Sequence, residues 1–132
     1  MQLTISTPLI DEMLAAAAAR PGEEVCGLLL GRGAAVDAIL ACANVAPVRQ
    51  DSFEIDPAAL IAAHRAGRGG GPAPIGHYHS HPRGGATPSA RDAAMAQPGS
   101  YWIILAGGAA RCWRADDRGG FDAVTMAPPV NR

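Results

Sequence analysis

The segment with the clearest chemical potential lies around residue 80. Residues 77–82 read HYHSHP, and residues 89–92 read SARD. Successive side chains of a strand alternate between its two faces, so His79 and His81 can present both imidazoles to one point. Imidazole nitrogens and one carboxylate are ordinary Zn²⁺ ligands, and Asp92 follows His81 by eleven residues. Three protein ligands plus a water form the open arrangement of a catalytic zinc site.

Spacing alone leaves two alternatives open. His77 lies on the same face of the expected strand as His79 and His81, so spacing does not choose among the three histidines. A histidine pair at a surface is more often without a metal than with one. Ser89 and Asp92 also match a capping box, in which each side chain satisfies a backbone N–H at a helix start and neither is catalytic.

A candidate general base lies far upstream of the histidines. Glu24 stands at the start of the apolar run VCGLLL, where a carboxylate is well placed to face a cleft. The plain alternative is a solvated strand end, which is what we expect of the neighbouring Glu23.

The first half of the chain predicts the elements that would position Glu24. Residues 2–6 alternate like a short strand, and Thr7 and Pro8 are a typical N-cap and N1 pair for a helix over residues 9–20. Residues 25–30 and 35–43 are apolar runs around a GRG turn, which predicts a hairpin of buried strands. Residues 53–55 predict a brief strand, and Asp56 and Pro57 begin a helix over residues 58–66.

The second half predicts the elements that would carry the metal ligands. Residues 67–74 form a Gly/Pro loop, for which we favour a plain linker over a mobile flap. A strand over residues 75–80 precedes a helix from residue 88 or 89 to about residue 96. Residues 101–106, 111–115 and 121–126 predict three closing strands. We see no repeat and no boundary, so we expect a single domain over residues 1–132, of class α/β or α+β around one sheet.

Composition narrows the classes of partner. Hydrophobic residues make up 48% of the 132 residues and charged residues 17%, as in globular proteins. A net charge of −1 and few aromatic residues give no reason to expect a nucleic acid. No secretory leader and no membrane-length apolar stretch is visible, so we expect a cytoplasmic protein without a membrane partner. Three widely spaced cysteines fit reduced thiols rather than a disulfide framework or a Cys₄ site.

In combination, these residues resemble the JAMM (MPN-plus, Mov34-type) metalloproteases. That pattern is a glutamate before a Cys-Gly strand, then His-Ser/Thr-His-Pro, then Ser-x-x-Asp after six intervening residues. Each part is present here with that spacing, from Glu24 through His79 and His81 to Ser89 and Asp92. Asn44 and residues 53–57 also resemble the compact bacterial branch.

The resemblance implies roles and a fold. His79, His81 and Asp92 would ligate one zinc ion per chain, Glu24 would hydrogen-bond the zinc-bound water and shuttle its proton, and Ser89 would help stabilise the oxyanion. The implied fold is a mixed, curved β-sheet flanked by helices, akin to the cytidine deaminases. A deaminase itself is disfavoured, because the chain has no PCxxC motif, and it has no HExxH motif either.

The resemblance also implies a substrate class. We expect a zinc metallopeptidase or isopeptidase that hydrolyses the bond after a C-terminal Gly-Gly of a ubiquitin-like or sulfur-carrier protein. A cleft at a sheet edge could take such a tail as an added strand. Short loops at residues 44–52 and 96–100 disfavour chain-specific deubiquitination, and the oligomeric state stays open. The alternatives are a non-catalytic scaffold of the MPN type and a zinc amidohydrolase that acts on a small substrate.

Overall fold

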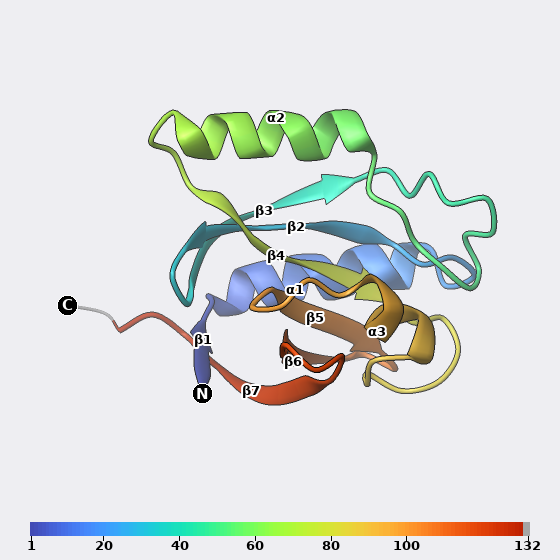
Figure 1. Cartoon of the computed structure of the whole chain (residues 1–132). Helices are drawn as coiled ribbons and strands as arrows, with labels where there is room; N and C mark the ends of the chain where they lie inside the picture. Colours follow the sequence, from blue (N-terminus) through green and yellow to red (C-terminus); the bar gives the residue numbers. More distant parts are fainter. Residues whose placement is uncertain (131–132) are drawn as a thin grey trace.

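A computed structural model describes residues 1–130 of the chain, with strands and helices intermixed along the sequence (Figure 1). The elements in chain order are β1 (Gln2–Thr4), α1 (Thr7–Ala19), β2 (Cys26–Arg32), β3 (Ala35–Cys42), α2 (Pro57–Arg68), β4 (Ala73–Ser80), α3 (Ala90–Met95), β5 (Tyr101–Ala106), β6 (Ala109–Ala115) and β7 (Phe121–Ala127).

The strands form one mixed sheet that closes into a barrel in the order β1-β3-β2-β4-β5-β6-β7. The expected mixed α+β class is confirmed, whereas the closure differs from the curved sheet of the sequence-based expectation. Closure depends on β1, which pairs in parallel with β7 along its length and with β3 at Thr4 and Ala35. Leu3 and Ile5 are almost fully buried, so the short strand is held by apolar burial as well as by hydrogen bonds.

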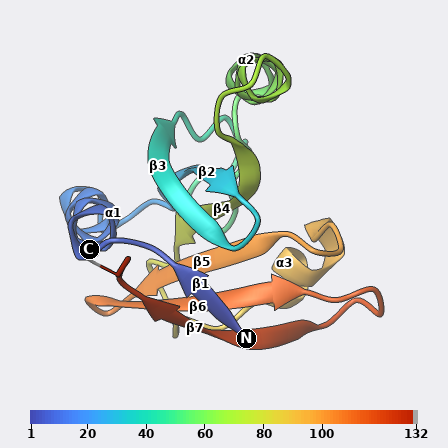
Figure 2. The same cartoon turned by 90° about the vertical axis from the view of Figure 1, so that its left-hand side faces the viewer.

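The barrel interior is the main core, and the helices pack outside it (Figure 2). Helix α1 contacts β5 and β6, whereas α2 lies over β4. Helix α1 directs Met13 into the barrel core, where the residue is fully buried. The buried core residues are Leu3, Ile5, Met13, Leu29, Val36, Tyr78, Tyr101, Ile103, Leu105, Cys112 and Val124.

Several element boundaries differ from the sequence-based predictions. Helix α1 begins at Thr7, with Ser6 as its N-cap, so the expected cap was one residue too late. Strand β2 begins at Cys26, which leaves Glu24 outside it.

The prediction of a buried β3 was wrong: β1 meets β3 at a single residue pair, so much of β3 is solvated and Leu40 is 41% exposed. Residues 53–55 form no strand and contribute one isolated bridge, between Ile55 and Asn44.

Helix α2 is longer than expected and shortens the loop that follows it. Asp56 is the N-cap, as predicted, and its side chain accepts a hydrogen bond from the Ala58 N–H. The helix continues to Arg68 and β4 starts at Ala73, so only residues 69–72 remain between them. Among residues 1–130, no helix is long and apolar enough to cross a membrane.

Candidate metal centre

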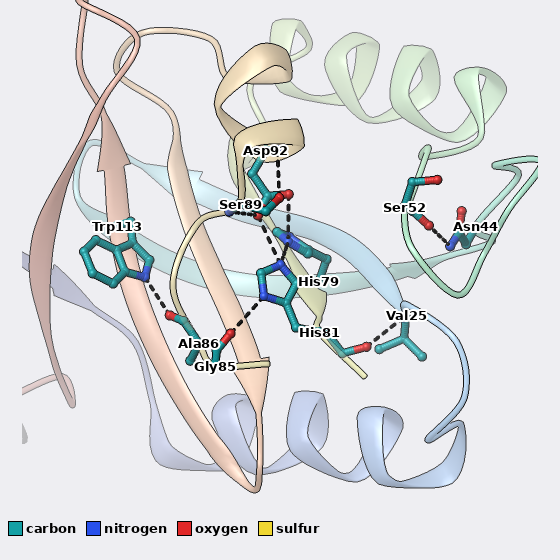
Figure 3. A network of polar contacts seen from close by, with 11 residues as sticks. Val25, Asn44, Ser52, His79, His81, Gly85, Ala86, Ser89, Asp92 and Trp113 are labelled. Carbon is teal, nitrogen blue, oxygen red and sulfur yellow. Dashed lines mark hydrogen bonds and ion pairs between the residues drawn. The ribbon is translucent and has the colours of Figure 1, made fainter. Parts of the chain in front are cut away.

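Strand β4 and the residue that follows it deliver two histidines, His79 and His81, to one point on the outside of the barrel. Tyr78 points into the core and is 2% exposed, so the neighbouring side chains of the strand point outward. The Nε2 atoms of His79 and His81 lie 3.1 Å apart (Figure 3). The alternation of the strand thus brings the two rings together, as the i, i+2 spacing predicts.

Asp92 reaches the same point from α3. Its Oδ1 lies 3.3 Å from His79 Nε2, and its Oδ2 lies 3.1 Å from His81 Nε2. The capping box is also present: the Ser89 side chain accepts from the Asp92 N–H, and the Asp92 carboxylate accepts from the Ser89 N–H. The cap and the metal centre are therefore compatible rather than exclusive, because a carboxylate has enough lone pairs for both.

The tautomer of His81 favours a cation between these groups. Its Nδ1 lies 2.9 Å from the Gly85 carbonyl oxygen, which can only accept, so Nδ1 carries the proton. In the neutral ring, Nε2 then presents a lone pair toward the Asp92 carboxylate. Two electron-rich atoms 3.1 Å apart repel unless a proton or a metal ion lies between them. The Asp92 hydrogen bond accordingly raises the pKa of His81.

The distances also suit zinc. Ligand atoms about 2.0 to 2.1 Å from a tetrahedral zinc lie roughly 3.3 Å from one another. The Nε2 atoms of His79 and His81 are 3.1 Å apart, and they lie 3.3 Å from Asp92 Oδ1 and 3.1 Å from Asp92 Oδ2, respectively. These donors and their spacing are therefore compatible with a zinc ion held by His79, His81 and Asp92.

Glu24 lies at the rim of this centre. Its carboxylate and the ring nitrogens of His79 and His81 all lie within 4.8 Å of one another. Unlike Asp92, Glu24 makes no hydrogen bond or ion pair with either ring among the described residues. It is 6% exposed, and burial raises its pKa to about 7. A carboxylate whose pKa lies near neutrality, next to the candidate metal ligands, suits a general base.

An aromatic cluster surrounds the histidines on the outer face. His79 is fully buried and stacks on Phe53, with ring centroids 4.3 Å apart. Its Nδ1 has no hydrogen-bond partner in the described part of the chain, so the ring is held by this packing and, through Nε2, by Asp92 Oδ1 at 3.3 Å. His77 packs against Trp102 at 4.1 Å, and its ring lies 5.7 Å from that of His79. His77 therefore belongs to the aromatic cluster, and burial lowers its pKa to about 3.

A cavity of about 900 Å³ adjoins the aromatic cluster. It lies between α2 and β4, and its lining includes Phe53, His77 and Trp102, whose rings neighbour that of His79. The strands beside the centre have no free edge, because β2, β4 and β5 each pair on both sides. Beyond β2, β3 pairs with β1 at Ala35, so the expectation that a substrate tail adds to a sheet edge stays a prediction.

Sequence reasoning missed the contacts that fix the loop between β4 and α3. The Trp113 indole N–H donates to the Ala86 carbonyl at 3.0 Å, and the adjacent Gly85 carbonyl orients His81 (Figure 3). Trp113 lies on β6, 27 residues away from Ala86. No local pattern links two residues at that distance, so only the tertiary structure could reveal the contact.

Comparison with known proteins places these residues in context. The family model for prokaryotic homologs of the JAB domain matches residues 6–116. A desampylase of Haloferax volcanii is 37% identical over 91 residues, which are 67% of this chain and 66% of that protein. A protein of Thermus thermophilus, described as a probable TtuB-protein conjugate cleaving protease, is 32% identical over 103 residues, 78% of this chain and 69% of that one.

A similar fold has been solved. A solution structure of a protein from Desulfitobacterium hafniense matches with a TM-score of 0.83 at 26% identity. The match covers 98% of this chain and 94% of that one.

Proposed function

Because the chain belongs to the compact prokaryotic branch of the JAMM/MPN family, we propose that it is a zinc-dependent isopeptidase with one zinc ion per chain. One observation carries the proposal: His79, His81 and Asp92 converge with zinc-like separations, and the buried Glu24 lies just outside them. An acidic base beside an open metal position is the arrangement that amide hydrolysis by water needs.

The residues of the site divide the chemistry between them. When bound, a zinc ion polarises the scissile carbonyl and lowers the pKa of water to about 7. Glu24 takes the water proton and passes it to the leaving amine nitrogen. Ser89 accepts from the Asp92 N–H, so its own hydroxyl hydrogen is free to donate to the developing oxyanion. One such donor contributes about 3 to 4 kcal/mol to the transition state.

No side chain needs to act as a nucleophile. Cys26 is buried beneath the aromatic cluster, and burial raises its pKa to about 12. The Ser80 hydroxyl is already engaged with the backbone of residues 23 and 25. Water is therefore the attacking group in the proposed reaction.

The substrate we propose is a protein whose C-terminal Gly-Gly is linked to a peptide, an amino acid or a lysine side chain. The relatives named as a desampylase and as a TtuB-protein conjugate cleaving protease support a ubiquitin-like or sulfur-carrier protein as that partner. Strands β2, β4 and β5 are paired on both sides, so beside the centre the tail would lie across the outer face rather than add to one of these strands. Glycines suit such a path, because Phe53 and Trp102 leave little room for side chains near His79.

A substrate series tests this proposal. A sulfur carrier fused through its Gly-Gly to a short peptide should be cut directly after the second glycine, as measured by mass spectrometry. Replacing that glycine with Val should abolish cleavage, because a β-branched side chain would crowd the approach to His79. A carrier with a Val substitution on a face remote from its tail is the matched control and should be cut normally. Equal cleavage of the Gly→Val substrate, or efficient cleavage of unrelated unfolded peptides, would indicate a general peptidase.

A further inference from the structure

The segment that carries Glu24 lies outside the regular sheet. Residues 23–25 precede β2, and the pairing with β4 continues past β2 through a bond from the Ser80 N–H to the Val25 carbonyl, which does not involve Glu24. The backbone of Glu24 is nevertheless fully bonded: its N–H donates to the Arg49 carbonyl at 2.7 Å, and its carbonyl accepts from Asn44 Nδ2 at 2.8 Å. Something other than secondary structure therefore determines where the Glu24 carboxylate lies.

The Asn44 side chain supplies part of that support. Its amide group also donates to the Ser52 carbonyl at 3.0 Å (Figure 3). Its Oδ1 accepts from the N–H groups of Ala46 and Glu54, both at 3.0 Å. All four hydrogen-bonding positions of the amide are used, which is the full capacity of an asparagine. One side chain thus ties Glu24 to the loop that follows β3.

Ser80 supports the same segment from the opposite side. Its hydroxyl accepts from the Val25 N–H at 2.9 Å and donates to the Glu23 carbonyl at 3.4 Å. The residue is 4% exposed and stands between His79 and His81 on β4. Its own N–H donates to the Val25 carbonyl at 3.0 Å. Both peptide units that flank Glu24 are therefore attached to the strand that carries the histidines.

We propose that Asn44 and Ser80 are positioning residues that together fix the Glu24 backbone relative to His79 and His81. Neither contributes a ligand atom to the candidate metal centre, so both act through Glu24. The catalytic part of the inference rests on the proposed function, in which Glu24 is the general base. A displacement of a catalytic group by about 1 Å can cost roughly a hundredfold in rate, so fixing this irregular segment has a direct kinetic consequence.

Amide hydrogen exchange tests the positioning without any substrate. In the metal-free full chain, Ser80→Ala removes the acceptor of the Val25 N–H, and exchange at Val25 should accelerate by about tenfold or more. Asn44→Asp keeps the size of the side chain but cannot donate to the Glu24 carbonyl. Because the segment is then held less firmly, exchange of the Glu24 N–H, which is bonded to the Arg49 carbonyl, should accelerate. The matched control is Ser52→Ala, which removes a hydroxyl that donates to the Val48 carbonyl and should leave both amides unchanged. Unchanged exchange in the first two variants would overturn the inference.

Kinetic measurements then distinguish a role in positioning Glu24 from a contribution to overall stability. Ser80→Ala and Asn44→Asp should bind zinc with wild-type stoichiometry and affinity, while kcat on the Gly-Gly fusion falls about 10- to 100-fold and KM changes little. Ser80→Thr keeps the hydroxyl and should restore most of kcat. A wild-type kcat in both variants, despite faster exchange, would overturn the catalytic role. A wild-type protein that cuts no Gly-Gly substrate would instead overturn the proposed function, and hydrogen exchange would still decide whether Asn44 and Ser80 hold the segment.

Discussion

At the scale of single residues, the Asp92 carboxylate takes part in both the cap of α3 and the candidate metal centre. Asp92 caps α3 through the Ser89 N–H at 2.9 Å and faces His81 Nε2 with the same oxygen. Burial raises the pKa of Asp92, but its hydrogen bonds with His79 and His81 outweigh burial and hold the pKa well below its usual range. The carboxylate thus stays ionised at neutral pH. Replacing Asp92 would remove a cap and a candidate ligand together, so the histidines and Glu24 are better sites for separating roles.

The ligand assignment predicts different outcomes for two histidines, His77 on β4 and His81 just after it. We expect His81→Ala to lose zinc, because it removes an Nε2 that lies 3.1 Å from both His79 and Asp92. His77→Ala should retain about one zinc per chain, because that ring packs against Trp102 instead. Elemental analysis after exhaustive dialysis measures both. Full zinc content in the His81 variant would show that the metal site lies elsewhere.

Substitution of Glu24 should lower turnover without changing zinc binding. Glu24→Gln keeps the size of the side chain, and we expect zinc content and affinity to be unchanged. The amide cannot take a proton from water, so kcat should fall by about 10² to 10⁴. Comparing zinc titrations with single-turnover rates gives the two effects separately. If zinc were lost as well, Glu24 would be a ligand and the proposed division of roles would be wrong.

At the scale of elements, strand register decides which residues meet. Strands β2 and β4 are antiparallel with Cys26 opposite His79, so continuing the pairing by two residues brings Glu24 opposite His81. The bond from the Ser80 N–H to the Val25 carbonyl shows that this pairing extends beyond β2. A shift of one residue would turn the histidines toward the core. The candidate centre therefore depends on the register of β4 with β2 and β5.

Gly76 provides a test of that register. A Cβ at this position would overlap the carbonyl oxygen of Tyr101, its partner on β5. We expect Gly76→Ala to lower the free energy of unfolding by about 2 kcal/mol or more, because β4 and β5 would have to move apart. Gly22→Ala is the matched control, since no atom lies within 4 Å of a Cβ there. Urea denaturation of the metal-free proteins measures the difference, and equal midpoints would contradict this account of β4 and β5.

At the scale of the whole molecule, the barrel wall separates two environments. The interior holds the apolar core, whereas the outer face beside α3 carries the aromatic cluster and the candidate metal centre. The three cysteines are free thiols. Cys112 lies in the core of the barrel, whereas Cys26 packs with the aromatic cluster on the outer face. Burial raises the pKa of each of these two thiols to about 12.

This arrangement predicts slow thiol chemistry in the folded protein. At pH 8, a thiol with a pKa near 12 is ionised in only about one molecule in ten thousand, and the thiolate is the reactive form. We expect Cys26 and Cys112 to resist iodoacetamide in the native protein and to react readily in urea, as peptide mass spectrometry would show. Cys42 is half-buried and should react first. Rapid native labelling of Cys26, with loss of activity, would favour a cysteine mechanism over water.

Much of the arrangement of the candidate site was predictable from the sequence because its signals are local. The i, i+2 spacing of His79 and His81 follows from strand geometry, and Asp56 was predicted as the N-cap of α2 from its place before Pro57. The mixed strand and helix class also followed from local patterns. The compact JAMM/MPN family followed from the combined spacing of Glu24, the two histidines, Ser89 and Asp92.

Only the tertiary structure decided the rest, because the remaining determinants join residues far apart in the chain. The closure of the barrel depends on a three-residue strand that pairs with β7 at the other end of the sequence. The histidines could not be ranked from spacing, since all three alternate with Tyr78 and Ser80 along β4 and its continuation; in the structure, the His77 ring packs against Trp102 instead. The position of Glu24 depends on Asn44 and Ser80, 20 and 55 residues from the groups that they bind. Side-chain periodicity fixes which face a residue takes, whereas the register of paired strands fixes which residues meet.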